Sequence, residues 1–170
     1  MRKFLITAAL AVAATLPLAA CNQQAQTPQQ MAAEEKPEVV PMPTDPSDRK
    51  AWQKYLVSVV TANMSGVKSN RPYVYFVPAG DDETSKNDRN NQLENVRNTV
   101  LRGVLPNNMM AFGGPDSKLT AELILEAFKD ARPGSFKDVV VLFIGGTAEG
   151  AAVKNGLDPT GADIRFVQAK

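Results

Sequence analysis

Two short stretches carry the residues that could do chemistry, and the first is the loop Gly145 to Gly150 (GGTAEG). It follows the apolar run Val139 to Ile144. Gly145 and Gly146 would let the backbone approach a ligand closely, and the next three amides would open a helix whose start carries partial positive charge. Such a loop can receive a small anion. It is also typical of a plain turn in which Thr147 caps a helix, and we favour this interpretation.

The hexamer GGTAEG resembles the glycine loop of precorrin-6A reductases, a family that binds a nicotinamide cofactor. In that family the loop follows the first strand of the domain, whereas here it follows the third expected strand. It is neither the dinucleotide fingerprint G-x-G-x-x-G nor a P-loop, which needs a Gly-Lys-Ser/Thr. We therefore expect this chain to bind no cofactor.

The second stretch is Asp81, Asp82 and Glu83. Carboxylates suit Mg²⁺ or Ca²⁺, and a pair of them can act as acid and base on a glycan. However, consecutive acids do not all point at one ion, and the patterns D-x-D-x-T and D-x-D-x-D-G are absent. A metal would be held by Asp82, Glu83 and Asp88. We favour a solvated acidic loop and expect no metal site.

The composition excludes several kinds of active site. The 170 residues include no His and one Cys, so Ser-His-Asp and Cys-His pairs and the commonest metal ligand are missing. Lys and Arg number 19 against 18 Asp and Glu, without the basic block that nucleic-acid binding requires. We expect no nucleic-acid partner and lean towards a protein without catalytic activity.

The only Cys ends a segment with the layout of a secretory signal. A basic start is followed by the apolar stretch Phe4 to Leu18, which is too short to span a membrane. The motif Leu18-Ala19-Ala20-Cys21 resembles the lipobox of bacterial lipoproteins. The resemblance implies cleavage before Cys21 and acylation of that residue. Because Asn22 rather than Asp follows, it also implies an outer-membrane anchor with the protein in the periplasm. An ordinary signal peptide with an incidental Cys is the alternative.

Three regions follow from these patterns. Residues 1–20 are expected to be the signal peptide, residues 21–44 a lipid-anchored linker, and residues 45–170 the folded domain. The linker is rich in Gln and Pro and has only scattered apolar residues, so it cannot bury enough surface to offset the entropy of ordering. We expect it to be a disordered spacer between membrane and domain.

Apolar spacing in residues 45–170 alternates between helical and strand periods, and Asp45 is expected to cap the first helix. The alternation predicts an α/β three-layer sandwich with a mainly parallel four-stranded sheet and an extra N-terminal helix. Because the first and third strands are the most continuously apolar, we expect them at the centre, in the strand order 2-1-3-4. The helices are expected near 45–65, 88–104, 117–132 and 147–155, and the strands at 73–77, 109–112, 139–144 and 164–167.

The expected order places a change of winding direction between the first and third strands, where ligands bind in open sheets. The loops after these strands would converge there. Trp52 and Tyr55 are expected in the core, and they would anchor a protein partner if they proved exposed. The ligand-binding candidates are Asp81, Asp82, Glu83, Gly145, Gly146 and Thr147.

The leading hypothesis is a lipid-anchored periplasmic domain that binds another protein and has no catalytic activity. Two roles fit it equally, an accessory of an envelope assembly and an immunity lipoprotein that neutralises a toxin. The alternative is a protein or enzyme that acts on a small anion or a glycan at the strand-end crevice. A structural link between membrane and wall is a third hypothesis.

We predict that Cys21 carries acyl chains in the producing cell. Cells grown with labelled palmitate should yield labelled protein, because the lipobox thiol receives the lipid. Recovery of the unlabelled, uncleaved chain among soluble cytosolic proteins would contradict the prediction.

Overall fold

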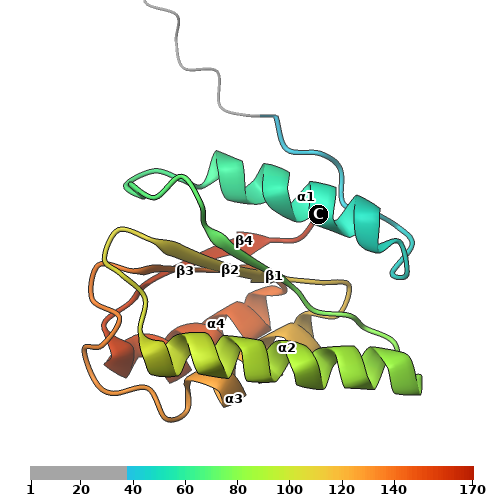
Figure 1. The fold of residues 1–170 in the computed structure, drawn as a ribbon. Coiled ribbons are helices and arrows are strands. Elements are labelled where there is room, and N and C mark those ends of the chain that lie inside the picture. Colours follow the sequence, from blue (N-terminus) through green and yellow to red (C-terminus); the bar gives the residue numbers. More distant parts are fainter. Residues whose placement is uncertain (1–37) are drawn as a thin grey trace, which may run out of the picture. The chain divides into compact units, whose positions relative to one another are not determined.

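The computed structural model describes residues 38–170, in which helices and strands alternate along the chain (Figure 1). The signal segment, Cys21 and the first part of the expected linker lie outside the described residues. None of the described helices is long and apolar enough to cross a membrane. The elements are α1 (Arg49–Ala62), β1 (Tyr73–Phe76), α2 (Glu83–Arg102), β2 (Met109–Gly113), α3 (Ser117–Phe128), β3 (Val140–Gly145), α4 (Thr147–Leu157), a 3₁₀ turn (Asp158–Thr160) and β4 (Asp163–Gln168).

The four strands form one parallel sheet in the order β1-β2-β3-β4, so the expected order 2-1-3-4 is wrong. The two inner strands are β2 and β3, all of whose residues are buried, and β1 lies at an edge. The third strand is central as expected, whereas the first is not. Tyr73 and Val74 of β1 are 44% and 36% exposed. The apolar run of β1 was misleading because aromatic and β-branched residues also occupy a half-exposed edge.

One hydrogen bond shows which backbone amides and carbonyls of β1 face β2 and which face away from the sheet. The amide of Val77 donates to the carbonyl of Gly113 at 2.9 Å. Because strand residues alternate in direction, the amide of Tyr75 also points towards β2, and the amides and carbonyls of Val74 and Phe76 point away from the sheet. The edge therefore offers two outward-facing residues.

The prolines that bracket β1 fit this edge position. Pro72 and Pro78 share the outward direction of the even-numbered residues, so the amide that each lacks would have pointed away from β2. Within sheets, proline is tolerated at edges for this reason. The two prolines were therefore a signal for an edge strand that our expected order did not use.

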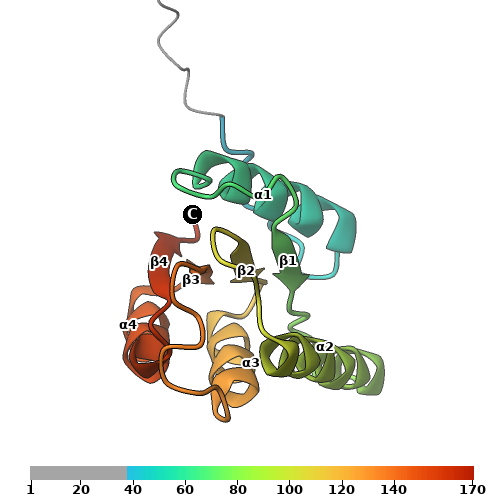
Figure 2. The same ribbon diagram turned by 60° about the vertical axis from the view of Figure 1, so that its left-hand side comes forward.

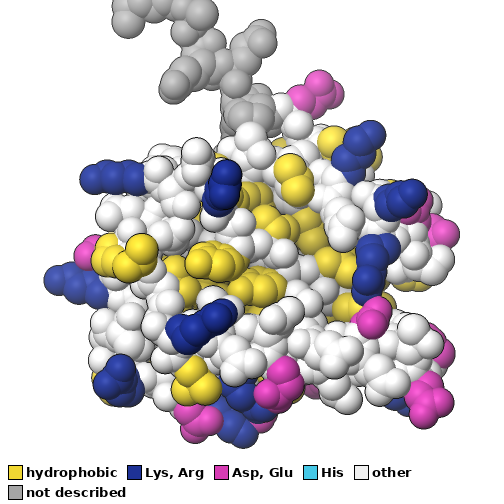
Figure 3. Space-filling view, viewed as in Figure 1, with side chains coloured by type: hydrophobic (Ala, Val, Ile, Leu, Met, Phe, Trp, Pro, Cys, Tyr) yellow, Lys and Arg dark blue, Asp and Glu magenta, His cyan; other side chains and the backbone are white. Residues whose placement is uncertain are grey.

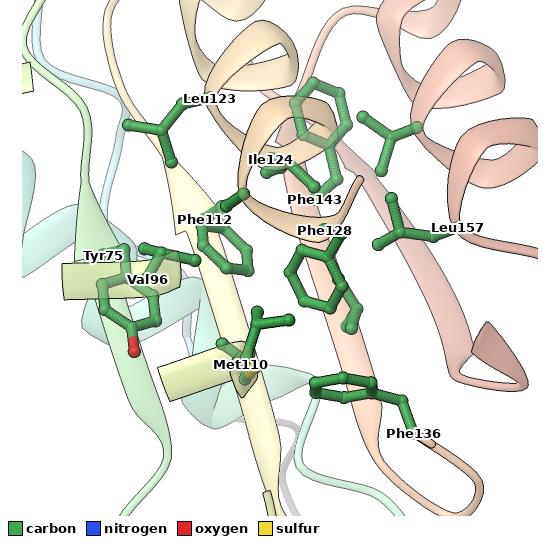
Figure 4. Packing of buried hydrophobic residues seen from close by; sticks show 14 of the residues in the cluster. Tyr75, Val96, Met110, Phe112, Leu123, Ile124, Phe128, Phe136, Phe143 and Leu157 are labelled. Atoms are coloured by element: carbon green, nitrogen blue, oxygen red, sulfur yellow. The ribbon is translucent and has the colours of Figure 1, made fainter. Parts of the chain in front are cut away.

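Three helices cover one face of the sheet. Each crossover joins neighbouring strands and advances in the same direction, so the right-handed rule places α2, α3 and α4 together (Figures 1 and 2). Their core contains a row of aromatic rings (Figure 4). The centroid of Phe112 lies 4.9 Å from that of Tyr75 and 6.4 Å from that of Phe128. The first contact joins β1 to β2, and the second packs α3 against β2.

The opposite face is covered by α1 (Figure 1). Five side chains of α1 are buried, and full burial of such residues stabilises by about 1.5–3 kcal/mol each. They pack on the other face of the two inner strands. The five are Trp52, Tyr55, Leu56, Val59 and Val60, and their inner-strand partners are Met109, Ala111, Val140, Leu142 and Ile144.

The first helix begins later than expected. Asp48, not Asp45, is its N-cap, and its carboxylate accepts the amide of Ala51 at 2.9 Å. Asp45 instead closes a local turn by accepting from the amide and hydroxyl of Ser47. Of the expected linker, residues 38–44 are described and have no helix or strand, and the amide of Val40 donates to Ser58 on α1.

We predict that Gly114→Ala destabilises the domain. An added Cβ would overlap the backbone carbonyl of Val77 where β2 turns towards α3, and backbone cannot move aside as a side chain can. The free energy of unfolding should fall by about 2 kcal/mol, as urea unfolding would measure.

The matched control is Gly156→Ala in α4. Its new Cβ meets the flexible end of Leu125, and alanine favours the helix by up to about 1 kcal/mol. Equal urea midpoints for the two variants would contradict the proposed clash.

Candidate functional site

The acidic stretch is the start of α2. This helix begins at Glu83, five residues earlier than the expected Asp88, and Asp82 is its N-cap. The carboxylate of Asp82 accepts the amide of Ser85 at 2.9 Å and its hydroxyl at 2.6 Å. The local signal for this cap was Asp82 itself, because Asp is among the residues preferred at an N-cap. Glu83 lies in the first turn of the same helix, so two of the three acids belong to the helix terminus.

Asp82 is held as a carboxylate by these bonds. The hydroxyl and then the amide of Ser85 lower the pKa of Asp82 below its ordinary value of 3.8. Asp81 and Glu83 are both exposed beside it. Within residues 38–170, no group of three or more acids, Cys or His is arranged to hold a metal ion.

The glycine loop after β3 is hydrogen-bonded to α3 and lies against a carboxylate of α4. The amide of Gly146 donates to the hydroxyl of Ser117 at 2.6 Å, and this hydroxyl donates to the carboxylate of Glu149 at 3.3 Å. The carboxylate also lies against Gly146, where an added Cβ would overlap it. The N-cap is Gly146, and Thr147 is the first helical residue, so the expected Thr147 cap is wrong. Glu149 therefore places a negative charge in the first turn of α4, the position at which a helix terminus favours an anion.

The two candidate loops do not meet. The first follows β1 and the second follows β3, and β2 lies between these strands. Two strand spacings separate them by roughly 10 Å. The predicted crevice depended on β1 and β3 being neighbours with opposite winding on either side, and the observed order has neither property. Asp82 therefore does not face Gly145, Gly146 or Thr147 across a ligand-sized gap.

A hollow of about 330 Å³ lies instead at the carboxyl end of β1. An ion pair of 2.6 Å between Arg49 of α1 and Asp88 of α2 crosses it, and the guanidinium lies 5.6 Å from the ring centroid of Phe76. Arg89 fixes the loop by donating to the carbonyls of Pro78 and Gly80 at 3.0 and 2.6 Å. The lining residues are Pro46, Ser47, Arg49, Phe76, Pro78, Ala79, Gly80, Asp82, Ser85 and Asp88.

A second hollow, of about 390 Å³, continues along β1. We call it the β1 groove, and its lining residues are Arg49, Gln53, Leu56, Val57, Val74, Phe76 and Gln92. Figure 3 shows hydrophobic side chains gathered in this area between α1 and α2. The residues come from α1, β1 and α2, so the edge strand forms the floor and the two helices form the walls.

The β1 groove was missed from the sequence. Its residues come from three separate segments, and no local spacing brings Gln53, Val74 and Gln92 together. The signal that was available is the pair of prolines around β1, since an edge strand must have an open side.

Trp52 and Tyr55 are not part of an exposed surface. Their exposed fractions are 3% and 2%, and their rings pack edge to face with centroids 5.7 Å apart. The indole of Trp52 donates to the carbonyl of Asp45 at 3.0 Å, and burial raises the pKa of Tyr55. Their proposed role as partner anchors was conditional on exposure, and the structure removes them from the candidate surface.

No protein-family model, curated protein sequence or solved structure matches the chain. The geometry alone therefore assigns the surface. The carboxylates of Asp82 and Asp88 are engaged in a helix cap and an ion pair. The β1 groove, in contrast, presents exposed apolar side chains beside outward-facing backbone groups, which suits binding better than acid-base chemistry.

We predict that Asp82→Asn flattens the acid dependence of stability. Because the folded state lowers the pKa of Asp82, its contribution is present above the ordinary value of 3.8 and is lost as the pH falls through the lowered value. Asn can still cap the helix but has no charge to lose. Urea midpoints measured between about pH 6 and pH 2 should fall less in the variant than in the wild type.

Asp81→Asn is the matched control, because it makes the same charge change at an exposed neighbour outside the cap. A steeper acid dependence in Asp82→Asn than in the wild type would contradict the assigned cap.

Proposed function

We propose that this chain is a lipid-anchored periplasmic protein, held to the outer membrane through Cys21, whose domain binds another protein and catalyses no reaction. The sequence supports the anchor through the lipobox and the address that it implies. The domain supports the binding role through the surface around β1. The two parts of the proposal rest on different residues and are testable separately.

The observation that carries the binding role is the exposed apolar surface at the β1 edge. Val57 of α1 is 54% exposed, and Tyr73 and Val74 of β1 are 44% and 36% exposed. Val57 and Val74 line the same groove. Apolar residues that gather in a hollow and are rimmed by polar ones are typical of an interaction site.

The enzyme alternative has less support. It required Asp82 or Glu83 to face Gly146 across a pocket, and these residues belong to loops on strands that are not neighbours. The carboxylate of Glu149 accepts the hydroxyl of Ser117 and lies against Gly146, so a small anion at this loop would meet a negative charge already in place. A protein partner at the β1 groove needs no such rearrangement.

Both expected roles remain consistent with this surface. An accessory of an envelope assembly would hold the groove against a permanent neighbour. An immunity protein would use it to cover a toxin that enters the periplasm. The tether serves either role because it keeps the domain near the membrane while leaving the groove free to meet its partner.

We predict that a photo-crosslinking amino acid at position 57 captures a protein partner in living cells. Position 118 is the matched control, because the side chain of Lys118 is 78% exposed on α3, away from the groove. The position-57 product should lose most of its intensity when Cys21→Ala releases the chain from the membrane, since anchoring raises the local concentration of an envelope partner.

Equal products from positions 57 and 118 would contradict the assigned surface. An undiminished position-57 product in Cys21→Ala would contradict the contribution of the anchor and leave the surface assignment intact.

A further inference from the structure

We propose that the β1 groove binds an extended segment of the partner protein as an added strand beside β1. The segment has apolar side chains at alternate positions and acidic residues at its ends. This inference rests on the proposed function only in taking the partner to be a protein. It goes further in assigning the conformation and the chemistry of what is bound.

The backbone of β1 supplies the first reason. Val74 and Phe76 direct their amides and carbonyls away from β2, and no hydrogen bond from any residue in 38–170 reaches these four groups. Such a row of open donors and acceptors is a template for another strand. An extended segment satisfies both donors and both acceptors at once, which a helix placed in the groove cannot do.

The shape of the groove supplies the second reason. Arg49, Gln53 and Val57 of α1 form one wall, Gln92 of α2 lies on the other, and β1 is the floor between them. Figure 3 shows this hollow from its open side. A second copy of the chain carries its β1 at the floor of the same groove, so the helical walls of two copies would meet before their strands could pair. A single extended chain from a different protein fits between the walls.

The side chains define what the segment presents. Val74 and Phe76 point to the same face of the sheet as α1, where Val57 adds a third apolar side chain. Because side chains of an added strand alternate, every second residue of the segment would lie on this apolar surface. The amides of Gln53 and Gln92 border it and can donate to or accept from polar groups of the residues between.

The charges around the groove define the ends of the segment. Lys50 and Lys54 lie beside Gln53 and Val57 on the outer side of α1, in a hollow that adjoins the groove and that Asp48 also lines. Burial raises the pKa of Tyr75 on β1, and Arg102 of α2 lies close enough to oppose part of that rise. Of the nearby acids, Asp88 is paired with Arg49, and Asp48 accepts the amide of Ala51 as the N-cap of α1. The surplus positive charge favours acidic residues in the partner and speeds their encounter.

The other edge of the sheet is less suited to strand addition. β4 places Asp163 and Arg165 on the α1 face, and these two side chains pair at 2.8 Å. Arg165 also donates to the carbonyls of Asn63 and Ser65 beyond the end of α1. Charged residues on an edge oppose the addition of another strand. β4 therefore provides an internal control for the test.

The test begins with a displayed library of random peptides about nine residues long, panned against the full chain in detergent micelles. The selected peptides should show alternating apolar residues with Asp or Glu near the ends. The strongest one is then synthesised in two N-methylated forms, one blocked at the odd positions and the other at the even positions. One form should lose at least tenfold in affinity and the other should keep most of it, because only alternate amides of an added strand face β1.

The protein carries the matching pair of substitutions. Val74→Pro removes one outward amide of β1 and leaves every bond to β2 in place, and it should weaken peptide binding about tenfold. Gln168→Pro removes an outward amide of β4 and should leave binding unchanged. Urea midpoints report whether each variant is folded. On peptide binding, the amides of Val74 and Phe76 in the wild type should exchange at least tenfold more slowly.

Failure to enrich any peptide would overturn the inference, as would equal effects of the two N-methylated forms. The N-methylation test uses wild-type protein, so it decides the question even if Val74→Pro does not fold. Binding that is lost in Gln168→Pro but kept in Val74→Pro would place the strand at β4 and also overturn it. Because the purified chain is used, these outcomes do not depend on lipid attachment or on the crosslinked partner in cells.

Discussion

The structure depends on one topological constraint. When parallel strands follow one another across a sheet in chain order, right-handed crossovers place every connecting helix on the same face. Here α2, α3 and α4 all lie on one side, and the other side of the sheet contains Met109, Ala111, Val140, Leu142 and Ile144 with no crossover helix to cover them. The helix that precedes β1 must supply the cover. The N-terminal helix is thus a required part of the core.

A single helix is too narrow to cover a face of four strands. The uncovered part of that face determines where the β1 groove lies. α1 buries its five apolar residues over the two inner strands, where the sheet is most apolar. Towards β4 the gap is closed by Arg165, whose guanidinium reaches the carbonyls after α1. Towards β1 the gap is closed only at its end by the pair Arg49–Asp88, and the rest remains open as the β1 groove. The candidate site lies where the single covering helix stops.

The sequence predicted the helices and strands well, but it did not predict which strands are adjacent in the sheet. Apolar spacing indicated an α/β domain with four helices and four parallel strands, and the structure has these. Strand order depends on contacts between distant segments, and the uniform apolarity of residues 73–77 fits an edge strand as well as a central one. In the structure half of β1 faces α2 and half faces the groove. Composition alone does not distinguish these two environments.

The error in strand order also determined the error in the site. The crevice between the acidic and glycine loops was inferred from the winding switch, and without the switch the two loops are separated by β2. The acidic stretch is exposed, as the favoured interpretation of a solvated loop requires, but it belongs to the start of α2 and not to a loop before Asp88. Asp82 is among the residues preferred at an N-cap, and this role competes directly with a ligand-binding interpretation. The bracketing prolines were the informative residues, because proline marks strands that have one open side.

The same prolines limit what the open edge can bind. They leave only Val74 and Phe76 with both an amide and a carbonyl directed outward, so these two residues offer an added strand four backbone hydrogen bonds. At about 1 kcal/mol each, these bonds fall short of the cost of association, which is on the order of 4–15 kcal/mol. Each apolar side chain that the partner buries fully in the groove would add about 1.5–3 kcal/mol. Backbone pairing therefore sets the register of a partner, and the apolar side chains of the groove must supply both the affinity and the selectivity.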